Sequence, residues 1–268
     1  METILEIHNL QMSFPFSHKK RDLQSRLIRG AELLIHRNRI SALIGGNGVG
    51  KTTMFNLING FLTPDEGQII YYPDRKAISL NNRSPYQVAR LGIGRLFQGS
   101  RTFDGLSLRE CLMIAANERA MEKPFYPLFA PRQLRRKKAL LDKKIHALLH
   151  DVGDHRFIKN LDLPVRNLSY AQQRILNMIS LLMGDYRMVL LDEPCSGISP
   201  DDWDTVGQIM LEMQSRGITL LLIEHNLDFI RKYIQDCHYM SSGRIVCSGP
   251  TAAVLEMPEV REEYLALC

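Results

Sequence analysis

The segment GGNGVGKTT, residues 45–53, constrains the fold of this chain more than any other feature. It fits the pattern G-x-x-x-x-G-K-[ST], which is typical of loops that bind phosphate groups. The apolar stretch RISALIG before it predicts a strand, and TTMFNLING after it predicts a helix that ends at Gly60. Strand, glycine-rich loop and helix in this order predict a phosphate-binding loop in an α/β nucleotide-binding fold.

The residue types in this loop suit phosphate chemistry. Glycines let the backbone wrap an anion, and the backbone N–H groups then point inward. The N-terminus of the following helix adds a partial positive charge. We expect Lys51 to reach the β- and γ-phosphates of ATP and the Thr52 hydroxyl to ligate Mg²⁺. The other loop residues that we expect to contact ATP are Gly45, Asn47, Gly48, Gly50 and Thr53.

A second segment, RMVLLDE at residues 187–193, supplies the carboxylates that such a loop needs. An apolar strand that ends in an acidic residue places Asp192 at the carboxyl edge of the sheet, beside the phosphate loop. Asp192 is therefore a candidate Mg²⁺ ligand, directly or through water, and Glu193 is a candidate general base for an attacking water. The segment is weak evidence alone and strong evidence together with the loop.

The rest of the chain alternates strands with helices, apart from its middle. We predict strands at 4–14, 31–44 and 67–72, with an exposed loop or hairpin over 17–30. Helical spacing of apolar residues dominates between about 98 and 170, and alternation returns after 174. The further expected elements are a strand ending at Asp192, a helix at 204–217, a strand at 218–225 and a hairpin turning at Ser242–Gly243.

These elements predict one domain over 1–268, an α/β fold with a RecA-like P-loop NTPase core. Continuous apolar strands imply a mostly parallel sheet covered on both faces. The N-terminal strands form an antiparallel part, and the nucleotide-binding core comprises 1–97 and 175–268. Residues 98–174 are the expected inserted α-helical subdomain.

Composition limits where such a protein works. No stretch reaches 18 consecutive apolar residues, and METILEIHNL is not typical of a signal peptide. Five scattered cysteines without a C-x-x-C motif favour a reduced, cytoplasmic protein. The net charge of +5 fits nucleic acid, an anionic membrane or a phosphorylated ligand. We interpret the basic run at 132–144 as a solvated helix face, so no nucleic acid is expected as a partner.

With these motifs together, the chain resembles the ATPase subunit of an ABC transporter over essentially its whole length. Gln98 in GIGRLFQ matches the family's Gln-loop, which contacts Mg²⁺ and couples to the membrane subunit. His225 in LLIEH matches the switch histidine, which contacts the γ-phosphate. LSYAQQR, residues 168–174, occupies the place of the LSGGQ signature. The resemblance also implies an aromatic residue that stacks on adenine; Phe14 is the best candidate and Phe16 the next.

Within that family, the chain is most similar to the larger ATPase of branched-chain (hydrophobic) amino-acid uptake transporters. The similar segments are ARLGIGRLFQGSRTFDGLSLRECLMIA, EPCSGISP, IEHNLDFI and GPTAAVLEMPEVREEYLA. That subfamily's signature is typically LSYGQQR, so Tyr170 is expected and only Ala171 departs. The alternatives are the ATPase of a lipid or lipopolysaccharide exporter, and a soluble ABC ATPase that acts on ribosomes, DNA or iron–sulfur assembly.

The resemblance also implies partners and a location. Two ATPase subunits face each other, and the signature of each completes the ATP site of the other. The expected partners are transmembrane permease subunits and a second ABC ATPase, in a heterodimer or a homodimer. The chain would sit on the cytoplasmic face of the inner membrane, peripherally, through its permeases.

The signature segment also predicts its own local structure. Ser169 is a good helix N-cap, and Ser169 with Gln172 fits a capping box. Ala171 then falls at the second helical position, where alanine aids a helix by up to roughly 1 kcal/mol over glycine. Its methyl group points where the family brings backbone close to the partner's γ-phosphate, so we hypothesise that the partner's ATP site is weakened. A buried stripe is expected at Ile175, Met178, Ile179 and Leu182.

Overall fold

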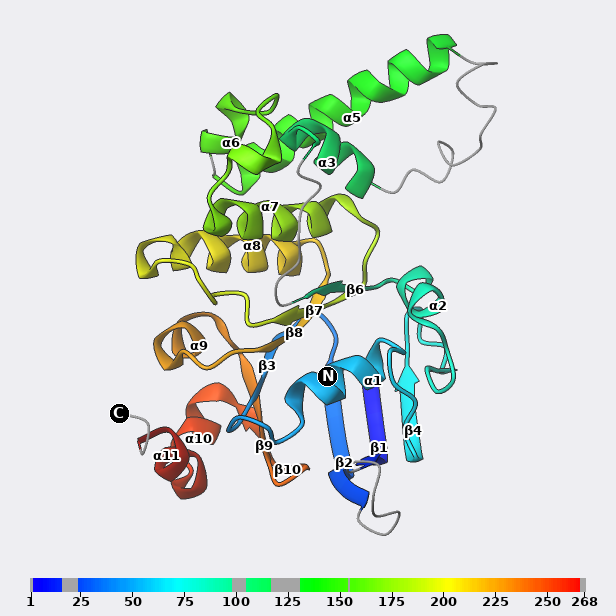
Figure 1. The fold of residues 1–268 in the computed structure, drawn as a ribbon, viewed down its shortest axis with the longest axis vertical. Helices are drawn as coiled ribbons and strands as arrows, with labels where there is room; N and C mark the ends of the chain where they lie inside the picture. Colours follow the sequence, from blue (N-terminus) through cyan, green and yellow to red (C-terminus); the bar gives the residue numbers. More distant parts are fainter. Residues whose placement is uncertain (1, 16–23, 98–104, 117–130, 154, 266–268) are drawn as a thin grey trace. The chain divides into compact units, whose positions relative to one another are not determined.

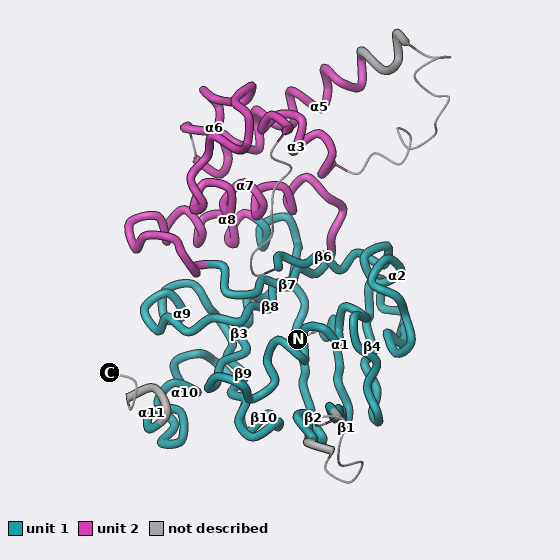
Figure 2. Tube along the Cα trace, in the orientation of Figure 1, with its two compact units in different colours: residues 1–97, 187–194, 213–268 teal, residues 98–186, 195–212 magenta. Residues whose placement is uncertain are grey.

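The computed structural model of this chain describes residues 2–15, 24–97, 105–116, 131–153 and 155–265. They fall into two compact units, of which unit 1 comprises residues 1–97, 187–194 and 213–268, and unit 2 comprises 98–186 and 195–212 (Figure 2). Compact units need not coincide with an inserted subdomain. The division into a core at 1–97 and 175–268 and an insert at 98–174 therefore stays a prediction.

The larger sheet of unit 1 has the strand order β10-β9-β3-β8-β7-β6 (Figure 1). All neighbours pair in parallel except β10, which is antiparallel to β9. Every residue of β3, β7 and β8 is buried, as expected for strands covered on both faces. The strands are β3 (Ile40–Ile44), β6 (Ile93–Leu96), β7 (Met188–Asp192), β8 (Thr219–Ile223), β9 (Asp236–Ser241) and β10 (Arg244–Pro250).

The second sheet of unit 1 is antiparallel, with the order β2-β1-β4-β5. Its strands are β1 (Thr3–Pro15), β2 (Gln24–His36), β4 (Glu66–Tyr71) and β5 (Ile78–Ser79). One hydrophobic cluster joins its inner face to the parallel sheet and includes Ile7, Ile28, Phe55, Leu190 and Met240. The predicted α/β class, with a mostly parallel sheet and an antiparallel N-terminal part, is confirmed.

Local capping signals set where several helices begin. Ser84, Ser107 and Ser169 each cap a helix, and each forms a capping box with the Glu or Gln three residues on. In the described residues no helix combines the length and apolar character needed to cross a membrane. The helices are α1 (Lys51–Ile58), α2 (Pro85–Arg90), α3 (Leu108–Ala115), α5 (Pro131–Asp151), α6 (His155–Lys159), η1 (Val165–Asn167), α7 (Tyr170–Met183), η2 (Pro200–Asp202), α8 (Trp203–Ser215), α9 (Leu227–Tyr233), α10 (Thr251–Leu255) and α11 (Pro258–Leu265).

The prediction of one strand over 31–44 is wrong. β2 ends at His36 and β3 begins at Ile40, and the two belong to different sheets. The chain turns between them at Asn38, which has a φ of 55°. Four polar residues, His36–Arg39, separate two apolar runs at this turn, and this break was the available signal for the end of the first strand.

For the exposed loop or hairpin predicted over 17–30, the structure agrees with the hairpin alternative from residue 24 onward, because this part is a strand antiparallel to β1. Residues 24–30 belong to β2 and pair with β1, whereas 17–23 lie outside the described residues. The predicted hairpin at Ser242–Gly243 is confirmed. Both residues have positive φ, 48° and 78°, and they join β9 to β10. This matches a two-residue hairpin turn with left-handed conformations at both positions.

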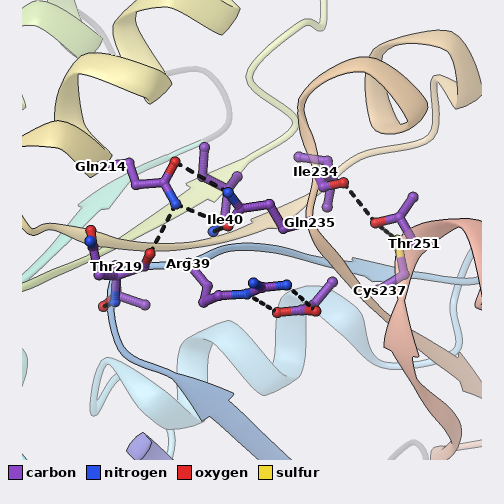
Figure 3. A network of polar contacts seen from close by, with 10 residues as sticks. Arg39, Ile40, Gln214, Thr219, Ile234, Gln235, Cys237 and Thr251 are labelled. Carbon is purple, nitrogen blue, oxygen red and sulfur yellow. Dashed lines mark hydrogen bonds and ion pairs between the residues drawn. The ribbon is translucent and has the colours of Figure 1, made fainter. Parts of the chain in front are cut away.

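A polar network fixes the start of β3 (Figure 3). The backbone N–H of Ile40 donates to Gln235 Oε1 at 3.1 Å, and Gln214 Nε2 donates to the same oxygen at 2.9 Å. Arg39 donates to both carboxylate oxygens of Asp236, at 2.6 and 2.7 Å. These contacts lie at the start of β3, whereas the phosphate loop follows Ile44 at the other end of the strand.

Candidate functional site

The phosphate loop runs from the end of β3 into α1. Gly45, Gly48 and Gly50 have φ values of 143°, 77° and 113°. Residues that carry a side chain rarely adopt such conformations. A Cβ added at Gly45 would overlap the carbonyl oxygen of Met240. The backbone therefore lies too close to β9 for any residue but glycine at this position.

Lys51 is the first residue of α1, and it is buried. Its Nζ atom donates to the carbonyl oxygens of Gly45 and Gly46, at 2.6 and 2.7 Å. No side chain caps α1, and its first turn carries no acidic residue. The Lys51 ammonium group and the backbone N–H groups at the N-terminus of α1 thus lie at the same loop. This arrangement favours the binding of an anion.

The loop lines a cavity of about 150 Å³ in unit 1. The backbone N–H groups and the cation of the loop lie at this cavity, which therefore suits the phosphate groups of a ligand. Glu193 and His225 line the cavity together with the loop, and their catalytic roles stay a prediction. Its full lining is Leu27, Asn47, Gly48, Gly50, Lys51, Thr52, Thr53, Glu193, Ile223 and His225.

Glu193 directly follows β7 and has a φ of 50°, an uncommon conformation for a residue with a side chain. Its backbone N–H donates to the carbonyl of Ile223 at 3.0 Å, which ties the turn to the end of β8. Strained backbone of this kind clusters at functional sites. Here it places a carboxylate in the cavity.

His225 follows β8 and is held by its neighbours. Glu224 is buried, and its Oε1 accepts from the backbone N–H groups of His225 at 2.9 Å and Asn226 at 3.3 Å. The Asn226 side chain in turn caps α9. Burial, followed by the positive charge of Lys51, lowers the pKa of His225, although Glu193 and Glu224 oppose this. The imidazole is therefore neutral at pH 7.

Asp192 is the last residue of β7 and is buried, and it does not line the cavity. Its Oδ2 accepts from Arg95 on β6 at 3.0 Å. Sequence reasoning missed Arg95, as it missed Glu224. A charged residue inside the apolar run GIGRLF was the available signal, because a buried arginine needs a partner.

Thr52 and Asp192 have the chemistry of Mg²⁺ ligands, since this ion prefers hydroxyl and carboxylate oxygens. The described residues hold no cluster of three or more His, Cys, Asp and Glu side chains that could form a metal site. Mg²⁺ bound together with a phosphorylated substrate needs only one or two carboxylates. The residues therefore fit the ion, and their assignment as ligands stays a prediction.

Other predicted site residues lie elsewhere. Phe14 pairs with Ser25 in the antiparallel sheet, is partly exposed and does not line the cavity, so its role in adenine binding stays a prediction. Gln98 and Phe16 lie outside the described residues.

The signature residues belong to unit 2, where Ser169 caps α7 and exchanges hydrogen bonds with Gln172. Ala171 is the second residue of that helix, as predicted. The ring of Tyr170 lies against Gly197, because a Cβ added there would come within 2.6 Å of its Cε1 atom. The predicted stripe is buried: Ile175, Met178, Ile179 and Leu182.

Comparison with known proteins gives consistent matches. The family model described as ABC transporter matches residues 28–196. The chain is 29% identical to "Probable branched-chain amino acid transport ATP-binding protein LivG" of Archaeoglobus fulgidus, over 86% of each chain. It is 26% identical to "High-affinity branched-chain amino acid transport ATP-binding protein LivG" of Escherichia coli K12, over 89% of this chain and 91% of that protein.

Solved structures agree with these matches. An ATP-binding cassette of an ABC transporter in its ADP conformation is similar with a TM-score of 0.78 and 26% identity, over 99% of both chains. A nucleotide-free ATP-binding cassette is similar with a TM-score of 0.73 and 25% identity, over 98% of both chains. The similarity covers both compact units.

Proposed function

This chain belongs to the ABC transporter family, and on that premise we propose that it powers the import of branched-chain (hydrophobic) amino acids. It is an ATPase of the ABC type and binds ATP. The observation that carries the proposal is that the phosphate loop, Glu193 and His225 line one cavity. The names and the 26–29% identity of its relatives support the choice of substrate.

Each site residue has a separate role in the hydrolysis of ATP. Lys51 and the backbone N–H groups of the loop hold the β- and γ-phosphates, and His225 contacts the γ-phosphate through its imidazole. Glu193 takes the proton of a water whose oxygen attacks the γ-phosphorus, while the bond to the β-phosphate oxygen breaks to leave ADP and phosphate. Thr52 and Asp192 would hold Mg²⁺, which neutralises phosphate charge when bound.

Transport needs a second ATPase subunit, because the signature serves the partner's nucleotide. We propose that two cassettes close on two ATP molecules and that hydrolysis reopens them. Ser169, Tyr170, Ala171 and Gln172 would face the partner's ATP. Permease subunits would hold the complex at the cytoplasmic face of the cell membrane and receive the motion through the region of Gln98.

The test is a purification of the tagged full chain from its own membranes, followed by uptake measurements. We expect permease proteins and a second ATPase to co-purify. We also expect labelled leucine uptake to be lost in Lys51→Ala cells and restored by the wild-type chain. Co-purification with ribosomes or assembly factors, or a Lys51→Ala strain with normal uptake and altered envelope lipid, would contradict the proposal.

A further inference from the structure

Arg95 lies on β6 with its side chain 4% exposed, beside the Asp192 carboxylate at 3%. Its Nη2 donates to Asp192 Oδ2 at 3.0 Å, and its Nη1 donates to Asn56 Oδ1 on α1 at 2.7 Å. One guanidinium therefore joins the helix that follows the phosphate loop to the end of the strand that carries Asp192.

Aromatic rings fix the same guanidinium further. Its central carbon lies 4.6 Å from the ring centroid of Phe97 and 5.7 Å from that of Phe55, within the range of cation–π contacts. A planar, forked group held by two hydrogen bonds and two rings has little freedom to rotate. The Asp192 oxygen that it binds is held in one place as a result.

This arrangement is costly for the fold, which argues against a purely stabilising role. Burying two charges carries a desolvation penalty that an ion pair often fails to recover. Burial also lowers the pKa of Arg95, although Asp192 opposes the effect. In addition, Arg95 Nε is buried and has no hydrogen-bond partner among the residues that the structure describes. An apolar pair would fill this space at less cost, so the function of Asp192 is the better explanation.

We propose that Arg95 is a positioning residue, which fixes the orientation of the Asp192 carboxylate and thereby sets the affinity of the site for Mg²⁺. The inference rests on the proposed role of Asp192 as a metal-binding residue. Groups that orient metal ligands commonly change metal affinity by about 10- to 100-fold when they are removed. Arg95 acts through Asp192 and is not itself a ligand.

The experiment titrates Mg²⁺ into the purified full chain and follows the binding of a fluorescent ATP analogue, with a parallel measurement in EDTA. Arg95→Met should raise the Mg²⁺ concentration for half-maximal binding by about 10- to 100-fold and leave binding in EDTA unchanged. We call this concentration the Mg²⁺ midpoint. Asn56→Ala removes one hydrogen-bond partner of the guanidinium and should raise the Mg²⁺ midpoint by less than Arg95→Met does. Arg95→Lys keeps the positive charge but lacks the forked guanidinium, so its Mg²⁺ midpoint should lie between those of Asn56→Ala and Arg95→Met.

Arg39→Met is the matched control. It breaks another Arg–Asp pair of unit 1, with Asp236, at residues that do not line the cavity (Figure 3). It should lower thermal stability without moving the Mg²⁺ midpoint. An unchanged midpoint in Arg95→Met, with lowered stability alone, would overturn the inference. Should Arg95→Met fail to fold, an unshifted midpoint in Arg95→Lys and Asn56→Ala would overturn it equally.

A double variant separates this inference from the proposed role of Asp192. Asp192→Asn alone should raise the Mg²⁺ midpoint, and adding Arg95→Met should then raise it little further. If Asp192→Asn shifts the midpoint but Arg95→Met does not, only the role of Arg95 fails. If Asp192→Asn has no effect, the role of Asp192 in the proposed function fails, and the inference with it.

Discussion

His225 Nε2 lies 3.7 Å from Glu193 Oε1, at the ends of the neighbouring strands β8 and β7. This separation is too long for a hydrogen bond. The pKa of His225 is lowered, mainly by burial, so the imidazole does not act as a permanent cation beside the carboxylate. Both side chains therefore line the cavity without a hydrogen bond to each other.

Gly197 and Tyr170 give a prediction within unit 2. Gly197 has a φ of 73°, and a Cβ there would lie 2.6 Å from Cε1 of the Tyr170 ring. We expect Gly197→Ala to destabilise the protein by more than the roughly 1 kcal/mol of backbone strain alone. Denaturant unfolding of the full chain measures this.

The control for that prediction is Gly217→Ala. Gly217 has a similar φ of 80°, and an added Cβ would meet no atom within 4 Å, so it reports strain without a clash. Adding Tyr170→Ala to Gly197→Ala should recover the part of the stability loss that exceeds the loss in Gly217→Ala. Equal losses of unfolding free energy in Gly197→Ala and Gly217→Ala would show that the Tyr170 ring does not constrain the loop at Gly197.

Buried His238 predicts a pH dependence of stability. Its Nδ1 lies 2.8 Å from Ser248 Oγ, and burial lowers its pKa to about 4. The unfolded chain binds a proton near the ordinary value of 6.5, whereas the folded chain does not until about pH 4. Stability should therefore be complete above pH 6.5 and fall as the pH decreases, by about 2 kcal/mol between pH 7 and 5.

His238→Asn should remove that part of the pH dependence, because asparagine can keep a hydrogen bond to Ser248 and does not titrate. The measurement is the free energy of unfolding at pH 7, 6 and 5 in both proteins. Identical slopes for wild type and variant would show that His238 does not account for acid sensitivity in this range.

Ala171 gives a prediction for the assembled complex. Ala171→Gly should raise ATP turnover, because glycine would let the backbone at the start of α7 approach the partner's γ-phosphate. The same change should cost the isolated chain at most about 1 kcal/mol of stability. No gain in turnover, with the variant folded and assembled, would contradict the hypothesis that this methyl group weakens the partner's site.

Local patterns made much of this structure predictable. The phosphate loop, the capping box at Ser169 and the hairpin at Ser242–Gly243 each depend on a few adjacent residues, whose backbone preferences are known. The polar run His36–Arg39 marks a break within 31–44, but no local pattern shows that the strands on its two sides belong to different sheets.

Partners that are distant in sequence were harder to predict. Arg95 and Asp192 are 97 positions apart, and no local pattern pairs them. Leu27 and Ile223 line the cavity as ordinary apolar residues, so their types gave no sign of a site. For Glu224 the signal was an acidic residue that directly follows an apolar strand, but only the structure shows that it holds the backbone of His225.

The most direct test of the central claim, that Glu193 is the base of an ATP site built on this chain's own loop, is hydrolysis of prebound ATP by Glu193→Gln. In the purified chain, alone and with co-purified partners, the variant should bind ATP as tightly as wild type. It should release phosphate at least about 100-fold more slowly, because the proton acceptor is lost. Hydrolysis at the wild-type rate would contradict the account.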